Sequence, residues 1–150
     1  MAIKLVKIAI PFIWFGMIGA ISFVEAPLKF QAPGITLPLG LGIGRLVFQM
    51  LNKIEMVMAV IMAAAFLLNR RERGLPMYLF LLAAAILAFQ TLWLLPELDA
   101  RAELVIAGET PPGSSEHIVY IVVESIKLLL LLAIGIFTTR TVIKGVGNEI

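Results

Sequence analysis

The sequence contains no cysteine, and His117 is the single histidine among its 150 residues. Without cysteine the chain has no disulfide framework, no thiolate nucleophile, no thiolate metal site and no thiol redox chemistry. Any metal ion would have to be held by carboxylates and that one imidazole. The absence of one residue type therefore removes several functional classes together.

Charged residues are also scarce. They make up 15% of the chain, whereas soluble domains contain about a quarter. Hydrophobic residues make up 61%, and the mean hydropathy is +1.02, which predicts an integral membrane protein with membrane lipid as its surroundings. A formal net charge of +2 does not indicate a nucleic-acid partner, because the basic residues stand between apolar runs and not in one patch.

Four apolar runs are long enough to cross a bilayer as helices. We predict a single all-α domain over residues 1–150, a four-transmembrane-helix bundle with helices at about 8–25, 45–68, 77–95 and 117–139. The first run follows Lys4 and Lys7 and so also imitates a signal peptide, but its length suffices for a span. Trp14 and Trp93 are interpreted as interface or packing aromatics.

Two connecting stretches have distinctive compositions. From Glu25 to Gly44 the chain contains three prolines and repeated glycines, yet it is apolar for a loop. We expect an irregular, apolar Pro/Gly-rich connection between the first two helices, lying in the membrane interface or covering the bundle as a lid. Residues 97–107, which follow Pro96, are suited to a short amphipathic surface helix.

The orientation follows from the distribution of basic residues. One side of the membrane receives Lys4, Lys7, Arg70, Arg71, Arg73, Arg140 and Lys144, while the opposite connections are mostly acidic. By the positive-inside rule we expect both termini to be cytoplasmic, an N-in/C-in arrangement. The unusual polar residues of every helix then gather in the non-cytoplasmic half.

The last apolar run carries a polar stripe. At about 100° per residue, His117, Tyr120, Glu124 and Lys127 fall within about a quarter of the helix circumference. Ionisable groups at membrane depth are costly unless they pair or face a cavity, so they indicate a functional site. The candidate catalytic residues are Glu55, Glu124 and His117, and the candidate ligand-binding residues are Glu25, Arg45, Asn52, Gln90, Tyr120 and Lys127.

Several chemistries fit these residue types. Glu25, Glu55, His117 and Glu124 offer a ligand set for a divalent iron, manganese or zinc ion in a helix bundle. Against that, the Glu-x-x-His spacing of di-iron bundles is absent, and His117 and Glu124 are about 10.5 Å apart along the helix axis. Alternatively, two glutamates in unequal surroundings are suited to acid/base chemistry on a lipophilic small molecule dissolved in the membrane.

Two further alternatives use the same residues. Intramembrane Glu, His and Lys chains carry protons or ions, but no polar path leads from Glu55 or Gln90 to the cytoplasmic face. In the second alternative the stripe is an interhelical lock, a set of polar contacts that only holds the helices together. Glu124 then pairs with Lys127, and Glu55 pairs with Lys53 or Arg45. The protein would then be a non-catalytic accessory or assembly subunit of a larger membrane complex or a homo-oligomer, so the sequence leaves open whether it is an enzyme.

Short motifs along most of the chain resemble a known family. They are Phe23-Val24-x-x-Pro27-x-x-Phe30, Gly44-x-Leu46-x-Phe48, Leu92-Trp93-Leu94-x-Pro96 after Gln90, and His117 followed by Ser125. In these the chain resembles the small four-span membrane family typified by transmembrane protein 205 and its bacterial relatives of unknown function. The resemblance implies a four-helix membrane bundle and no settled activity, and the carboxylates at Glu25, Glu55 and Glu124 depart from the family pattern. We expect a protein of the bacterial inner (plasma) membrane.

Overall fold

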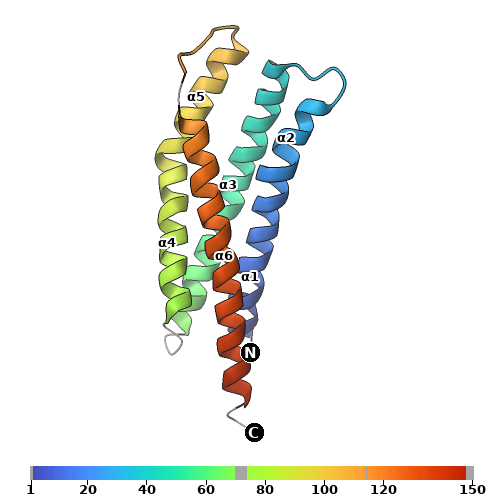
Figure 1. Ribbon diagram of the computed structural model, residues 1–150. Helices are drawn as coiled ribbons and strands as arrows, with labels where there is room; N and C mark the ends of the chain where they lie inside the picture. Colours follow the sequence, from blue (N-terminus) through green and yellow to red (C-terminus); the bar gives the residue numbers. More distant parts are fainter. Residues whose placement is uncertain (1, 70–73, 114, 148–150) are drawn as a thin grey trace.

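A computed structural model describes residues 2–69, 74–113 and 115–147. Within those ranges every regular element is helical, and four helical stretches are long and apolar enough to cross a membrane. These stretches are Ala2–Gln31, Leu37–Leu68, Leu75–Ile106 and Glu116–Ile143. The prediction of an all-α, four-helix membrane bundle is therefore confirmed (Figure 1). The chain is a small polytopic membrane protein.

The first span is longer than predicted at both ends. It consists of α1 (Ala2–Ile18), the π-helical η1 (Gly19–Glu25), α2 (Ala26–Leu28) and the 3₁₀ turn η2 (Lys29–Gln31). The helix begins before residue 8 because Lys7 packs inside the bundle, with its Nζ 4.8 Å from the centre of the Phe66 ring. It continues beyond residue 25 through Pro27, which follows the π-helical η1, and ends at Gln31.

The second span, α3 (Leu37–Leu68), corrects the prediction for the first connection. Irregular chain was expected as far as Gly44, but the helix begins at Leu37. The Thr36 hydroxyl accepts a hydrogen bond from the Leu39 N–H at 3.4 Å, and Pro38 lies in the first turn, so this short stretch carries a complete helix start. Only residues 32–36 remain outside helices here, which is too short for the lid that was expected.

Two glycines of α3 allow the end of the first span to lie against this helix. A Cβ atom on Gly40 would lie 2.2 Å from Cε1 of Phe30, and one on Gly44 would lie 3.1 Å from Nζ of Lys29. Residues four apart share a helix face, and small residues in this pattern allow close helix packing in membranes. The glycines that predicted a loop instead form a packing face.

The third span also departs from the prediction. It joins α4 (Leu75–Phe89), the π-helical η4 (Gln90–Leu94) and α5 (Leu95–Ile106) without a break, where a separate surface helix from residue 97 was expected. Pro96 does not end the helix: it follows the π-helical η4, and the helix continues through it into α5.

The fourth span, α6 (Glu116–Gly147), runs past its predicted end at residue 139. The hydroxyls of Thr139 and Thr141 donate to the carbonyl oxygens of Gly135 and Phe137 at 2.8 and 2.9 Å. These bonds satisfy the two polar side chains within the helix itself, so the threonines do not interrupt it.

The helices pack as a bundle in which α6 contacts mainly α1 and α4, while α3 contacts mainly α1 and α5. The core cluster of buried apolar residues is Trp14, Ile18, Met62, Phe66, Phe80, Ala83, Leu87, Leu131 and Ile134. In the second, third and fourth spans these residues lie nearer than Glu55, Gln90 and Lys127 to the end of the bundle that holds the start of α1 and the end of α6 (Figure 1). Lys7 and Thr138 are also buried, at the end that holds the apolar core, whereas the other buried polar residues lie toward the opposite end.

The predicted topology agrees with the fold in one respect. The start of α1, the end of α3 and the end of α6 lie at the same end of the bundle, as an even number of spans requires (Figure 1). Arg70, Arg71 and Arg73, which carried much of the orientation argument, and the side chain of Lys144 lie outside the described residues. The side of the membrane on which the termini lie stays a prediction.

We expect Gly40→Ala to lower the free energy of unfolding by about 1–3 kcal/mol, because the added methyl would overlap the Phe30 ring. Gly42→Ala is the matched control on the same helix, since nothing lies within 4 Å of its Cβ position. Thermal unfolding in detergent measures the difference. Equal midpoints for the two variants would contradict the close approach of Phe30 to α3.

Candidate functional site

A cluster of polar side chains is buried halfway along the bundle. Lys127 and Glu124 are 0% exposed, Gln90 is 1% exposed and Glu55 is 2% exposed. The Nζ atom of Lys127 lies 2.6 Å from Oε1 of Glu55 and 2.9 Å from Oε2 of Glu124, and it donates to Oε1 of Gln90 at 2.6 Å. The Trp14 indole N–H donates to Oε1 of Glu55 at 2.8 Å. One ammonium group therefore joins carboxylates from two helices.

The two oxygens of Glu124 have unequal partners. Oε2 receives the Lys127 ammonium and the Gln90 side-chain amide, the latter at 2.6 Å. Oε1 receives only hydroxyls, from Ser22 at 3.1 Å and from Tyr120 at 3.4 Å. Because a charge-assisted bond is shorter and stronger than one to a neutral donor, Oε1 is the less compensated oxygen.

Two π-helical segments lie at the level of this cluster. Ser22 belongs to η1, and Gln90 and Thr91 belong to η4. Such segments are rare, and within α-helices they are frequent at functional sites. Each of them supplies a donor to Glu124. Thr91 in addition accepts a hydrogen bond from the Asn52 amide at 2.8 Å, which joins η4 to α3.

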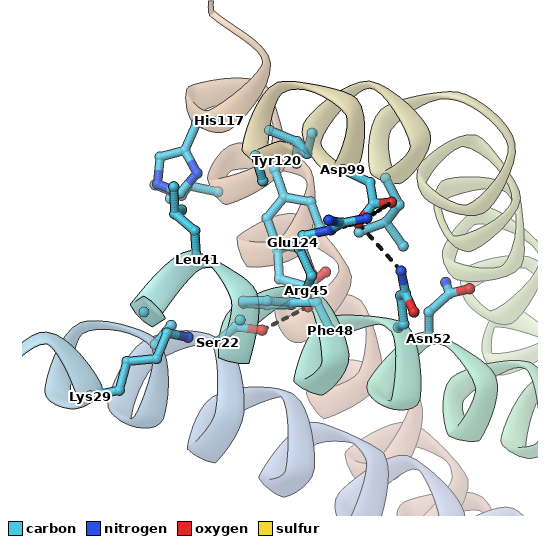
Figure 2. A pocket seen from close by; sticks show the side chains of 18 of the residues that line it. Ser22, Lys29, Leu41, Arg45, Phe48, Asn52, Asp99, His117, Tyr120 and Glu124 are labelled. Carbon is cyan, nitrogen blue, oxygen red and sulfur yellow. Dashed lines mark hydrogen bonds and ion pairs between the residues drawn. The ribbon is translucent and has the colours of Figure 1, made fainter. Parts of the chain in front are cut away.

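A pocket of ≈ 830 Å³ lies beside the cluster, in the half of the bundle away from the apolar core. Figure 2 shows Ser22, Tyr120 and Glu124 converging on it from the first and fourth spans. Its apolar lining includes Phe23, Phe30, Leu41, Phe48, Met56, Leu95, Leu98 and Ile121. Glu124 lines the pocket, whereas Glu55 does not. The rings of Phe48 and Tyr120 meet edge to face, with centroids 5.6 Å apart.

Ion pairs surround the outer part of the pocket. Arg45 of α3 donates to Asp99 at 2.8 Å and to Glu103 at 2.6 Å, both on α5. Within the first span, Lys29 pairs with Glu25 at 3.3 Å. The two basic side chains that enter the pocket wall here are thus already compensated by carboxylates.

Three predicted site residues, Glu55, Gln90 and Glu124, meet around the ammonium group of a fourth, Lys127, and the Tyr120 hydroxyl also donates to Glu124. The i,i+3 pairing of Glu124 with Lys127 is confirmed. The predicted partners of Glu55 were wrong, because Lys127 takes the place assigned to Lys53 or Arg45. Sequence spacing on one helix cannot show which helix supplies the counter-ion.

The other predicted residues lie around this centre. Asn52 and Tyr120 are buried beside it and line the pocket, and Arg45 and His117 line its outer part. His117 is exposed at the start of α6. Glu25 is not in the pocket lining, but it pairs with Lys29, which is.

The predicted metal set is not assembled. Among the residues that the structure describes, no three side chains of the Asp, Glu and His types come together as a metal site. The Lys127 ammonium occupies the space between Glu55 and Glu124, where a cation would bind. Glu25 is held by Lys29, and His117 is at the rim. The four residues predicted to bind iron, manganese or zinc are therefore not gathered into a metal site in the described part of the chain, and metal binding by them is not shown.

Sequence reasoning missed three partners. Trp14 was interpreted as an interface or packing aromatic, but it is 0% exposed and bonded to Glu55. Asp99 was predicted to lie on a separate surface helix, but its carboxylate forms an ion pair with Arg45 of α3. Ser22 was overlooked, even though it is the only hydroxyl-bearing residue between Ala2 and Gln31. A lone hydroxyl within an apolar run could have identified Ser22 as a candidate site residue.

Comparison of the chain with protein-family models, with curated proteins and with solved structures finds no match. The resemblance to the four-span family accordingly carries no assignment of activity. What the site can do has to be argued from its own geometry.

Replacing Lys127 by Met should lower the free energy of unfolding by about 3–5 kcal/mol, because two buried carboxylates would lose their shared counter-ion. Lys53→Met is the control, since Lys53 is exposed and surface substitutions usually change stability by less than about 0.5 kcal/mol. Thermal unfolding in detergent compares the two. If both variants unfold with the wild-type midpoint, Lys127 does not hold the cluster together.

Proposed function

We propose that this protein binds a lipophilic small molecule within the membrane, in the pocket that ends on Glu124. The observation that carries the proposal is the ≈ 830 Å³ pocket with mainly apolar walls and a buried carboxylate in its lining. Ligand sites are typically about 300–1,000 Å³, apolar, and supplied with a few polar groups that fix orientation. The pocket has these three properties.

The pocket's place in the fold favours a molecule that arrives from the bilayer. Residues of all four membrane spans line it, and most of them are apolar. Most of the wall area is apolar, so a ligand with a large apolar part buries more of its surface there than a wholly polar one. A lipophilic molecule with one polar group matches the arrangement, since that group can meet Glu124 while the rest contacts phenylalanine, leucine and methionine side chains.

The buried cluster has two separate roles in this proposal. Glu55, Gln90 and Lys127 hold the helices and fix the side chain of Glu124, while Glu124 and Tyr120 face the ligand. Of the three candidate catalytic residues, Glu124 is the one that is both buried and in the pocket lining. Any acid/base chemistry on the ligand therefore falls to Glu124, with Glu55 as a positioning residue.

The rival function is that of an accessory subunit in which the cluster is only an interhelical lock. The three donors of the Lys127 ammonium all have acceptors, which favours a structural role for that residue. A lock alone does not explain the pocket, because the ion pairs and hydrogen bonds of Lys127 would form equally well in a bundle whose interior is filled by side chains. We therefore assign both roles to this protein: Lys127 holds the helices together, and the pocket binds the ligand.

The setting of the protein completes the proposal. We propose the bacterial inner (plasma) membrane with both termini cytoplasmic, which places the pocket in the non-cytoplasmic half. The resemblance to the family of transmembrane protein 205 supports a four-span membrane protein of this size and nothing more specific about chemistry.

A neutral alkyl diazirine tests whether the pocket binds lipophilic molecules. With protein in lipid nanodiscs, we expect saturable photolabelling of pocket-lining residues, mapped by mass spectrometry of peptides, while lipid-facing positions label without saturation. Ala102→Trp should abolish the saturable labelling, because Ala102 lines the pocket. Ala100→Trp is the control on the same helix, since Ala100 is exposed and not in the lining. Labelling that never saturates, or that survives Ala102→Trp unchanged, would sink the proposal.

A further inference from the structure

The buried cluster contains two carboxylates and one ammonium group. Glu55 and Glu124 both pair with Lys127, and their other partners, Trp14, Gln90, Ser22 and Tyr120, are neutral. With both carboxylates ionised, one negative charge lacks a positive partner. A buried charge without a counter-charge is costly in an apolar bundle. One further positive charge beside the cluster would therefore balance its two carboxylates.

The geometry shows which carboxylate oxygen a positively charged ligand can reach. All three donors of Lys127 are directed at Glu55, Glu124 and Gln90, so the ammonium has no further capacity. Oε2 of Glu124 lies on the Lys127 side, whereas Oε1 meets only the hydroxyls of Ser22 and Tyr120. Since Glu124 lines the pocket and Glu55 does not, the uncompensated oxygen belongs to the residue that a ligand can reach.

The other charges around the pocket do not cancel this surplus. Lys29 is paired with Glu25. Arg45 is paired with two carboxylates, Asp99 and Glu103, so this outer group also holds more negative than positive charge. The remaining basic residues in the lining are Lys53 and His117; both are exposed, so surrounding water and salt screen any charge that they carry.

The pocket walls suit a cation as well. Faces of aromatic rings attract ammonium groups within about 6 Å of their centroids. The Nζ atom of Lys29 already lies 5.5 Å from the centroid of Phe48 and 5.7 Å from that of Phe30, and both rings line the pocket. Tyr120 and Phe23 add two more aromatic side chains to the same lining.

We infer that the ligand of this pocket is a lipophilic monocation, an amine or quaternary ammonium compound whose charged group lies against Oε1 of Glu124 and the neighbouring rings. This inference rests on the proposed function, because it specifies the class of molecule that the same pocket takes. The cation supplies the missing positive charge, and its apolar part fills the phenylalanine-lined space. A neutral ligand leaves the surplus charge to be balanced by a proton.

A pair of isosteres tests the charge requirement. The saturable diazirine label is competed in nanodiscs by an alkyltrimethylammonium ion and by the hydrocarbon in which carbon replaces its nitrogen, at matched concentrations within the membrane. In the wild type the cation should compete about tenfold better or more, because the carboxylate and the ring faces attract only the charged member. Glu124→Gln should bring the two competitors to similar potency.

A second variant separates charge from contact. Glu55→Gln removes the surplus charge without changing a lining residue, so it should also reduce the preference for the cation. Equal competition by both isosteres in the wild type, or stronger competition by an alkylsulfonate, would overturn the cation inference while leaving the pocket proposal intact. Failure of every competitor, with no saturable label, would overturn both.

Discussion

The structure depends on the sharing of one buried ammonium group by two carboxylates. Lys127 connects α6 to α3 through Glu55, and Gln90 connects the third span to the same centre. In a bilayer the hydrophobic effect gives helices little reason to associate, so close packing and interhelical polar contacts have to hold them in register. The centre serves that purpose, and Oε1 of Glu124, on a residue that lines the pocket, is bonded to hydroxyls and not to the ammonium group.

The two halves of the bundle differ in their interiors. On one side of the centre, Trp14, Phe66, Phe80 and Ile134 belong to a continuous apolar core. On the other side the π-helical segments η1 and η4 direct Ser22 and Gln90 inward, and the spans enclose a pocket rather than a packed interior. Local departure from regular helix thus occurs at the level where the polar groups meet, which is the usual association of π-helical turns with functional sites.

The sequence predicted what depends on local pattern and missed what depends on the contacts between helices. The length and hydropathy of the apolar runs predicted the four spans. The free-energy cost of charged groups within a membrane identified Glu55, Glu124 and Lys127 as candidate site residues. Composition misjudged residues 37–44, because proline in a first turn and glycine on a packing face resemble a loop in one dimension. The sequence also could not predict the partners of Glu55, because nothing near Glu55 in the sequence indicates Trp14 or Lys127. For the same reason it did not predict that an ammonium group lies between Glu55 and Glu124.

Solid-state NMR in lipid bilayers tests the central arrangement most directly, by measuring how glutamate side-chain carboxyl ¹³C nuclei dephase the lysine ¹⁵Nζ signals, with the Lys127 signal assigned by its loss in Lys127→Met. The account predicts that this one ammonium is dephased by two carboxyl carbons at hydrogen-bonding range, with one contribution lost in Glu55→Gln and the other in Glu124→Gln. A Lys127 signal with one close carboxyl carbon, or with none, would contradict it.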